Sequence, residues 1–410
     1  MHNLLRFLSV STSLLALGIL AGCPTPKPPA SSNKVVVLGY NDLGMHCMNE
    51  DFSEIMILPP YNTLHAQVIE RRGEEPRILK SGVTVSYTIP GNTTSSDKTN
   101  FWDYVEDLFG VSVDPDVGLT GNGLSGTMVP SGTNDWVATG IPVTPIMDND
   151  DLNPYPLATI TVNRSGEDVA TTQAVVPVSW EISCNLCHAT DASDGQADAS
   201  VAMDILTDHD RLHQTTLASQ TPVACMDCHA QAPLGTTGDP SLSHAMHGAH
   251  ASRMAAANLQ VDCYACHPGQ VTQCLRDVHY ANGMTCADCH GDMTDVADPS
   301  RQPWVDEPRC DDCHQRNGFE FEQANTLYRD SKGHHGVHCA ACHGSPHAIT
   351  PSVEDADNVQ AIALQGHAGT IDTCTVCHTR RPDDHFDHRL DDDGDEGEEE
   401  DDKLLVSALQ

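Results

Sequence analysis

The chain has 410 residues and a formal net charge of −37 at pH 7, with 58 Asp and Glu against 21 Lys and Arg. A surface this acidic repels nucleic acid and anionic lipid, so the composition excludes a nucleic-acid-binding protein and favours cationic partners. The 17 cysteines are unevenly placed, because fifteen lie at or beyond Cys184 and Cys47 stands alone between Lys34 and Ser183. The two halves of the chain are therefore expected to do different jobs.

The N-terminus has the features of an export signal. Arg6 precedes an apolar run from Leu14 to Leu20 that is too short to span a membrane. The run ends in Leu-Ala-Gly-Cys23, the pattern of a bacterial lipobox, whose cysteine carries the lipid. We predict a lipoprotein signal peptide over residues 1–22 and a lipid-anchored, Pro-rich tether over 23–33; the alternative is an ordinary signal peptide with a chance cysteine. Pro24, where an Asp would favour the inner membrane, favours the outer membrane, at its periplasmic face or the cell surface.

Residues 34–183 are typical of an all-β, sandwich-like domain. Short β-branched runs alternate with clusters of Gly, Pro, Asn and Asp, and these runs are Val35 to Leu38, Val83 to Tyr87, Thr159 to Val162 and Val175 to Val178. Phe101 to Phe109 is expected to form one short helix. We therefore expect about 150 residues of mostly antiparallel sheet.

The composition changes after Ser183. Only seven aromatic residues remain from Cys184 to the C-terminus, so side chains alone could hardly build a core in this region. Residues 391 to 402 carry ten acidic side chains in twelve positions, which predicts a disordered acidic tail over 391–410. A calcium loop is the alternative for this tail, but the spacing does not match an EF-hand.

One pattern, Cys-x-x-Cys-His, is repeated seven times without deviation. The paired cysteines are Cys184 and Cys187, Cys225 and Cys228, Cys263 and Cys266, Cys286 and Cys289, Cys310 and Cys313, Cys339 and Cys342, and Cys374 and Cys377. The histidines that follow them are His188, His229, His267, His290, His314, His343 and His378.

The spacing of this motif suits covalent attachment of haem. Two thiols three positions apart on one turn can add to the two vinyl groups of one haem, and the adjacent imidazole becomes the proximal iron ligand. Zinc binding or disulfide pairing is the alternative, but a zinc site does not need histidine directly after the second cysteine. We predict seven haem c groups, fourteen thioether cysteines and seven proximal histidines.

The motifs follow one another closely, with 23 to 41 residues between successive first cysteines. Haems so closely spaced would touch one another and fill the interior that side chains do not supply. We therefore expect residues 184–390 to form a haem-packed cytochrome c domain with short helices and little regular secondary structure.

Each iron needs a sixth ligand unless it is catalytic, and thirteen histidines after Cys184 lie outside the motifs. The distal candidates that spacing favours are His213, His247, His250, His279, His335, His347, His367 and His388. His244, His247 and His250 recur at intervals of three, which places them near one face of an expected helix. Methionine ligation, which would raise the potential, is the alternative and could come from Met246, Met254 or Met284.

A second concentration of metal-binding residue types precedes the first motif. Met45, His46, Cys47 and Met48 are consecutive, with His65 nearby. Three interpretations remain open: a copper site, His46 as the distal ligand of the first haem, or a packed loop with Cys47 either buried or disulfide-bonded to Cys274.

At its seven motifs the chain resembles the multihaem c-type cytochromes of metal-reducing and related anaerobic bacteria. His334 to Ala348 and Gln365 to Thr370 are similar to blocks of the exported members, and Tyr40 to Met48 with Leu58 to His65 to an N-terminal block of lipoprotein cytochromes. The resemblance implies electron transfer at or outside the outer membrane, in extracellular or anaerobic respiration.

Under this resemblance the partners would be redox cytochromes or terminal electron acceptors, with the membrane reached through the lipid anchor. No Cys-x-x-Cys-Lys site, which leaves one iron open in pentahaem nitrite reductases, occurs in the chain. An electron carrier without a catalytic residue is therefore favoured. A reductase of nitrogen or sulfur oxyanions and a subunit of a haem filament are the alternatives.

Overall fold

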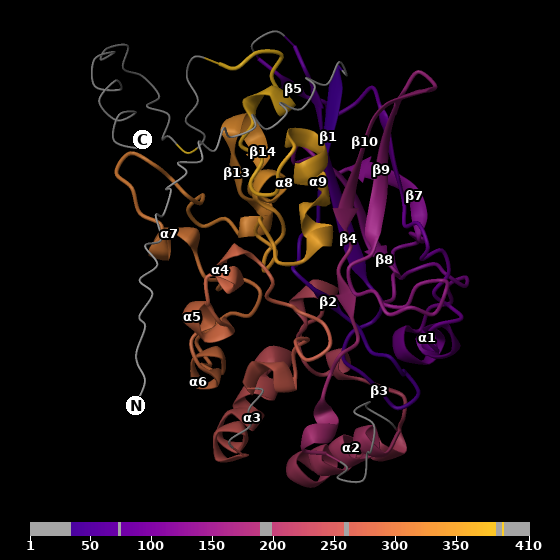
Figure 1. The fold of residues 1–410 in the computed structure, drawn as a ribbon. Coiled ribbons are helices and arrows are strands. Elements are labelled where there is room, and N and C mark those ends of the chain that lie inside the picture. Colours follow the sequence, from indigo (N-terminus) through magenta and orange to yellow (C-terminus); the bar gives the residue numbers. More distant parts are fainter. Residues whose placement is uncertain (1–33, 73–74, 189–198, 258–261, 383–387, 389–410) are drawn as a thin grey trace, which may run out of the picture.

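The computed structural model describes residues 34–72, 75–188, 199–257, 262–382 and 388. Figure 1 shows a large sheet on one side of the molecule and a row of short helices along the other. The predicted signal peptide, the lipidation site Cys23, the tether and the acidic tail lie outside the described residues.

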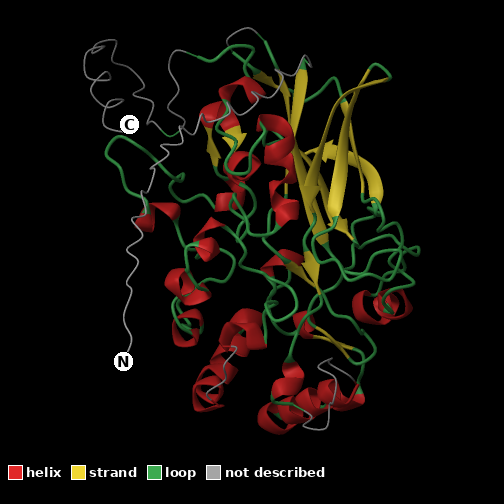
Figure 2. Ribbon diagram, in the orientation of Figure 1, coloured by secondary structure: helices red, strands yellow, loops and turns green. Residues whose placement is uncertain are grey.

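The strands belong mostly to the first half of the chain and the helices to the second (Figure 2). The strands are β1 (Val35–Tyr40), β2 (His46–Cys47), β3 (Ile55–Met56), β4 (Asn62–Glu70), β5 (Arg77–Ile78), β6 (Thr84–Thr88), β7 (Ser125–Pro130), β8 (Trp136–Ile141), β9 (Leu157–Arg164), β10 (Glu167–Val175), β11 (Val178–Ser179), β12 (Val223–Ala224), β13 (Lys332–Gly333) and β14 (Val337–His338). The α-helices are α1 (Phe101–Phe109), α2 (Ala199–His213), α3 (Leu242–Ala257), α4 (Val278–Ala281), α5 (Cys286–His290), α6 (Met293–Val296), α7 (Cys310–Cys313), α8 (Cys339–His343) and α9 (Asp355–Gln365).

Eight strands form one antiparallel sheet in the order β1-β4-β8-β7-β6-β9-β10, with β5 paired to β4. Strand β7 joins the two halves, because Ser125 to Met128 pair with β6 whereas Val129 and Pro130 pair with β8. The end strands then approach each other. A Cβ on Gly39 of β1 would lie 2.5 Å from Ile160 and 3.0 Å from Ala174 of β10, so only glycine fits there. The sheet is thus nearly closed into a barrel.

Alternating side chains build the core of this barrel. In β6 and β9 every second residue is buried, as expected for strands with one face on a core. Helix α1 covers one part of the core with Phe101, Val105 and Leu108, and it ends at Gly110, whose φ of 65° is the left-handed conformation common at helix ends. The predicted helix over Phe101 to Phe109 is confirmed.

The predicted antiparallel β domain is confirmed, but its form differs from two stacked sheets. One sheet curls round a single core because β7 changes partner halfway along its length. The nine-residue strand β4, which no sequence pattern singled out, lies between β1 and β8 and is almost wholly buried.

The region after Cys184 packs against the outer face of this sheet. Val36, Leu38 and Tyr40 of β1 form a second apolar cluster with Ala340 and Ala341 of α8, and with Val376. Short parallel pairs, β2 with β11 and β3 with β12, fasten the chain near the domain junction. No helix in the described part of the chain is long and apolar enough to cross a membrane.

Candidate functional site

Each of the seven Cys-x-x-Cys-His motifs folds as one helical turn. Three of the turns are α5, α7 and α8. The other four are the 3-10 turns η1 (Cys184–Leu186), η3 (Cys225–Asp227), η5 (Asp262–Ala265) and η8 (Cys374–Val376). In five motifs the histidine N–H donates to the carbonyl of the first cysteine at 2.8 to 3.0 Å. We number the motifs as sites 1 to 7 in chain order.

A second histidine lies opposite the motif histidine at every site. The seven partners are all different, and the ring centroids within each pair are 5.7 to 6.5 Å apart. From site 1 to site 7 the histidine pairs are His188 with His250, His229 with His209, His267 with His247, His290 with His347, His314 with His279, His343 with His388, and His378 with His334.

These separations suit one metal ion held between two imidazoles. Metal–nitrogen bonds of roughly 2 Å on both sides would set the ring centroids roughly 6 Å apart. Among the described residues no group of three or more His, Cys, Asp and Glu side chains could hold a metal ion. Each histidine pair could hold a metal ion whose other ligands come from a cofactor such as an iron porphyrin.

Hydrogen bonds fix the tautomer of several paired imidazoles. Their Nδ1 atoms donate to backbone carbonyls: His229 to Pro240 at 2.9 Å, His247 to Ser243 at 2.8 Å, His250 to Met246 at 2.7 Å and His388 to Glu320 at 3.1 Å. A carbonyl can only accept, so Nδ1 carries the proton and Nε2 keeps its lone pair. This is the tautomer that a metal-bound histidine needs.

At two sites the Nδ1 acceptor is a carboxylate. His188 donates to Asp204 Oδ2 at 3.1 Å in site 1, and His279 donates to Asp277 Oδ2 at 3.1 Å in site 5. A carboxylate in this position makes the imidazole a more basic ligand than a carbonyl does. Sites 1 and 5 therefore have a different electrostatic setting from the carbonyl-bonded sites.

Burial favours the neutral form of the paired imidazoles. It lowers the pKa of His209, His247, His267 and His290, and it lowers that of His347 to about 4. Burial acts in this direction because a low-dielectric environment penalises the charged imidazolium. Neutral imidazoles are the form in which histidine binds metals.

Shared helices set the order of the first three sites. Helix α2 provides His209 to site 2 and Asp204 to site 1, so these sites are neighbours. Helix α3 provides His250 to site 1 and His247 to site 3. Site 1 therefore lies between sites 2 and 3, although it comes first in the chain.

The remaining sites follow chain order. Site 4 adjoins site 3. Burial lowers the pKa of His267 in site 3 most, His247 lowers it next, and His290 of site 4 is near enough to lower it further. The backbone N–H of Arg276 donates to the carbonyl of His347 in site 4, and Asp277 beside it binds His279 in site 5.

Two contacts link the last three sites. The ring of Phe321 lies between His314 of site 5 and His388 of site 6, with ring centroids 6.1 and 5.6 Å apart. Ile371, three residues before the site 7 motif, donates to the carbonyl of Cys342 in site 6. The histidine pairs thus form one row in the order 2-1-3-4-5-6-7.

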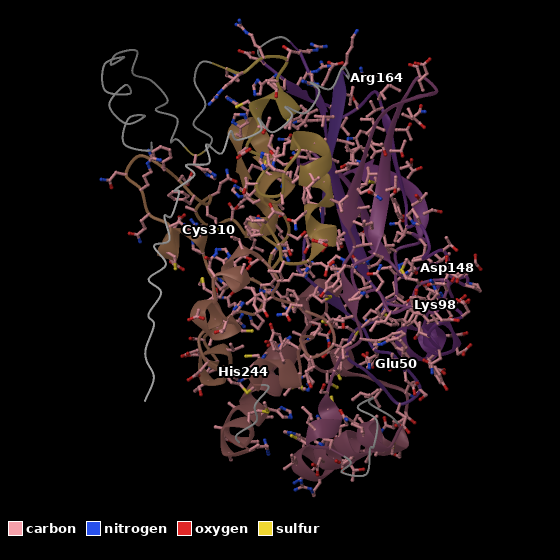
Figure 3. The ribbon with its side chains drawn as sticks, viewed as in Figure 1. Glu50, Lys98, Asp148, Arg164, His244 and Cys310 are labelled. Carbon is pink, nitrogen blue, oxygen red and sulfur yellow. The ribbon has the colours of Figure 1, made fainter. Side chains whose placement is uncertain are left out.

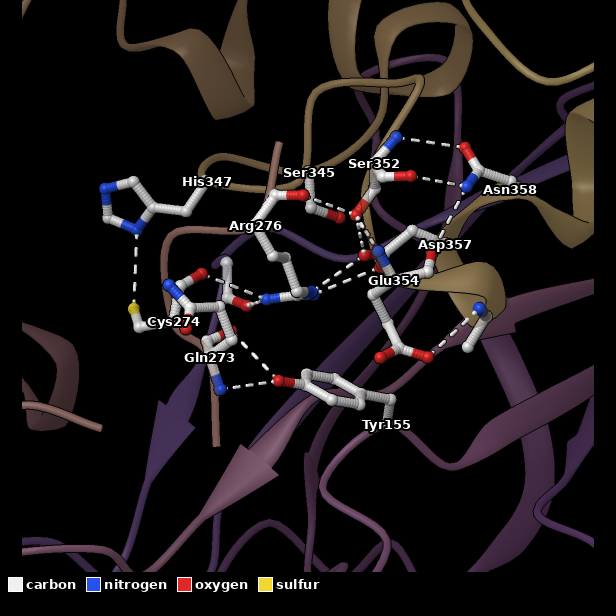
Figure 4. A network of polar contacts seen from close by, with 12 residues as sticks. Tyr155, Gln273, Cys274, Arg276, Ser345, His347, Ser352, Glu354, Asp357 and Asn358 are labelled. Carbon is white, nitrogen blue, oxygen red and sulfur yellow. Dashed lines mark hydrogen bonds and ion pairs between the residues drawn. The ribbon is translucent and has the colours of Figure 1, made fainter. Parts of the chain in front are cut away.

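A buried ion pair holds the partner histidine of site 4 in place (Figure 4). Arg276 is fully buried and bonds both carboxylate oxygens of Asp357, at 2.7 and 3.1 Å. Its Nη1 also donates to the carbonyl of Gly44, which ties this loop to the β domain. The Cys274 thiol lies 3.7 Å from Nδ1 of His347.

Five of the eight predicted distal histidines lie in pairs: His247, His250, His279, His347 and His388. The other three lie elsewhere. His213 touches His209, its neighbour one turn earlier on α2, and His335 touches His334. His367 is half-exposed, with its Nε2 3.5 Å from Asp372.

His209 and His334 occupy the two places that the sequence assigned to His213 and His335. Each lies beside the predicted residue, four positions away on a helix or directly next to it. Spacing along the chain does not distinguish such neighbours, because the choice depends on which ring faces the next segment. His338, which also lies outside the pairs, has its Nε2 towards the carbonyl of Thr133.

The residues from Met45 to Met48 do not converge on one point. His46 Nδ1 contacts the carbonyl of Tyr61 at 2.8 Å and Nε2 contacts Asn41 at 3.1 Å, so both nitrogens are used inside the β domain. Met48 is buried in the barrel core, and His65 bonds Asp135 at 2.7 Å.

This geometry fits neither a copper site nor His46 as the distal ligand of a haem. Cys47 is not in a disulfide bond; burial, followed by the neighbouring Cys274, raises its pKa to about 12. The interpretation that remains is the packed loop.

The sixteen cysteines that the structure describes are all free of disulfide bonds. Comparisons with models of protein families, with curated proteins and with solved structures found no match for this chain.

Proposed function

We propose that the protein is a heptahaem c-type cytochrome that carries electrons at or outside the outer membrane. The observation that carries this proposal is the one-to-one pairing of the seven motif histidines with seven other histidines at a metal-spanning distance. Each bound haem c would supply a one-electron carrier that shuttles between ferric and ferrous iron.

The residues have distinct roles in this proposal. The two cysteines of each motif hold the cofactor covalently, and the paired histidines provide both axial ligands. Acceptors such as Pro240, Ser243 and Asp204 orient the rings through Nδ1. Seven filled axial pairs leave no position for a substrate, which favours a carrier over a reductase.

The small side chains of this region also support a haem-packed domain. After Cys184 the buried apolar residues of the described chain are mainly alanine, with few larger residues such as Leu206 and Val376. Alanine leaves space for a large planar cofactor, whereas a side-chain core of this size would need larger residues. The finer fold assignment therefore belongs to the same proposal.

Export and anchoring rest on the leader sequence. We infer that residues 1–22 are removed and that Cys23 carries the lipid, which would hold the protein on a membrane surface without a spanning helix. Mass spectrometry of the mature N-terminus tests this inference. A lipid adduct on Cys23 is expected, and a Cys23→Ser variant should be released from washed membranes; a mature chain that begins elsewhere would contradict it.

The decisive experiment combines haem quantitation with electron paramagnetic resonance of the oxidised protein. We expect seven haems per chain, all low-spin. A count below seven would contradict the role of the motifs, and a large high-spin signal in the unmodified protein would favour the reductase.

Two adjacent histidines provide a matched pair of variants. His334→Ala should convert one haem in seven to high spin, because His334 is the partner of His378 at site 7. His335→Ala should leave all seven low-spin. If the two variants behave alike, or the wrong one changes, the axial assignment fails even when the haem count holds.

A further inference from the structure

Two cysteines of the described chain lie outside the seven motifs, and both are thiols in this structure. Cys47 belongs to β2 in the β domain, and Cys274 lies between the third and fourth motifs. The other fourteen described cysteines are those of the motifs; Figure 3 labels one of them, Cys310, among the short helices. Under the proposed function these fourteen hold haem and Cys23 holds the lipid, so Cys47 and Cys274 are the thiols that the chain keeps.

The segments that carry the two thiols run side by side. Thr272, two residues before Cys274, has its Oγ1 3.1 Å from Oγ of Ser179. Ser179 in turn pairs with Cys47 in the parallel ladder of β2 and β11. Burial raises the pKa of Cys47 most, and Cys274 raises it next. The fold therefore makes neighbours of two thiols from distant parts of the chain.

Both segments also touch His347, the partner histidine of site 4. The sulfur of Cys274 lies 3.7 Å from Nδ1 of His347 (Figure 4). Gly44, three residues before Cys47, lies so close that a Cβ on it would be 2.7 Å from Cβ of His347. Arg276 fastens both neighbours, because its Nη1 donates to the carbonyl of Gly44 and its backbone N–H to the carbonyl of His347. The thiol pair thus lies beside the middle site of the row.

We propose that Cys47 and Cys274 form a two-electron redox site that exchanges electrons with the row at site 4. This rests on the proposed function. On oxidation the two S–H bonds break and one S–S bond forms, two protons leave to the solvent, and two ferric irons of the row each take up one electron. Reduction reverses these changes. The pair would let a row of one-electron carriers store or deliver two electrons together.

Two features favour this site over a pair of inert thiols. The first is the contact with an axial ligand. At sites 1, 2, 3, 5 and 6 an Nδ1 atom of the pair donates to a carbonyl or a carboxylate, whereas at site 4 the atom next to Nδ1 of His347 is a sulfur that can be oxidised. The second is the compartment, since neighbouring thiols of an exported protein meet oxidising conditions in which a disulfide persists.

The test poises the holoprotein at an electrode without oxygen, first with its haems ferric and then with them ferrous. Rapid denaturation in N-ethylmaleimide alkylates every thiol, and peptide mass spectrometry locates the labels and any link. Coulometry on the same samples counts the electrons taken up per chain. Cys47→Ser removes one sulfur of the pair. Ser179→Ala is the matched control, because it changes a buried side chain in register with Cys47 and keeps both thiols.

With ferric haems we expect the peptides of Cys47 and Cys274 to be joined and unlabelled, and with ferrous haems we expect both cysteines to be labelled. Full reduction should take two electrons more per chain in the unmodified protein and in Ser179→Ala than in Cys47→Ser. Thiols that are labelled at every potential, or equal electron counts with and without Cys47, would overturn the proposal. A link that persists when all haems are ferrous would also overturn it, because the pair would then be a fixed structural disulfide.

Haem analysis keeps this inference separate from the proposed function. All three proteins should contain seven low-spin haems, since neither Cys47 nor Ser179 belongs to a motif or to a histidine pair. Fewer haems in the unmodified protein would disprove the proposed function, whatever the state of the thiols. Seven low-spin haems beside thiols that never change would leave that function standing and overturn the two-electron site alone.

Discussion

In the β domain Phe52, Phe101 and Leu64 are fully buried in one continuous apolar core, whereas the buried apolar residues after Cys184 are mainly alanine. The first region can pay the entropy cost of folding with its own side chains. The second packs against the sheet and brings histidines from distant segments into pairs. A single chain can thus join a scaffold built on its own side chains to a region that, under the proposed function, would be built round its haems.

The largest expected effect follows from withholding the cofactor. Under the proposed function, full-length chain made in a host without haem-attachment machinery should keep its β domain and lose the structure described after Cys184, because the buried apolar side chains there are mainly alanine. Limited proteolysis with mass spectrometry would then yield a resistant fragment that covers the β domain. Equal resistance of both regions in the haem-free chain would break the comparison.

A core substitution in the β domain should have the opposite effect, because it should destabilise this domain and leave the haem content unchanged. Phe101 is fully buried and contacts the rings of Phe52, Trp102 and Phe109. Phe101→Ala should lower the free energy of unfolding of this domain by about 3–5 kcal/mol, measured by denaturant titration of tryptophan fluorescence. Haem content should not change. Val111→Ala, at a side chain that is 45% exposed, is the control and should cost less than about 0.5 kcal/mol.

The junction of the two regions should respond to acid. Burial opposes the ionisation of Asp135, but hydrogen bonds from His65, Ser131 and Thr133 outweigh it and hold its pKa at about 2. Since this folded value lies below the usual one, its stabilisation is present above about pH 4 and is lost as the pH falls towards 2. It amounts to roughly 2 kcal/mol.

Asp135→Asn should remove this contribution, so that stability measured from pH 6 to pH 2 loses part of its slope below pH 4. Asp107→Asn, on the exposed face of α1, should keep the slope of the unmodified protein. An Asp135→Asn profile that runs parallel to the unmodified one would show that the network does not contribute in this way.

The smallest expected effect concerns the carboxylates at sites 1 and 5. Asp204→Asn and Asp277→Asn should each raise the midpoint potential of one haem, because the imidazole becomes a less basic ligand and ferric iron is less stabilised. A change of about 1 kcal/mol corresponds to roughly 40 mV for a one-electron couple. Asp107→Asn, on the exposed face of α1 in the β domain, should leave all potentials unchanged in spectroelectrochemical titration. A lowered potential in either variant would contradict the assignment.

Much of this architecture could be predicted from the sequence. The seven motifs, the change of composition at Cys184, the helix over Phe101 to Phe109 and the helix that carries His244, His247 and His250 all follow from local patterns. Local patterns suffice because the motif and its histidine occupy a single turn of the chain. The strands β1, β6 and β9 were recognisable for the same reason, since their β-branched runs are local.

The closure of the barrel was not predictable, because it depends on β7 changing partner and on Gly39 letting β1 approach β10. The number of histidine pairs and five of the seven partner histidines were predictable, but the other two partners were not. His209 and His334 lie in pairs and their neighbours His213 and His335 do not.

The sequence by itself therefore determined how many sites the chain has and which cysteines and histidines begin each of them. Only the tertiary structure decided which histidine completes each pair and that site 1 lies between sites 2 and 3. The physical reason is that a motif acts within one helical turn, whereas a pair and a row each join segments that are far apart in the chain.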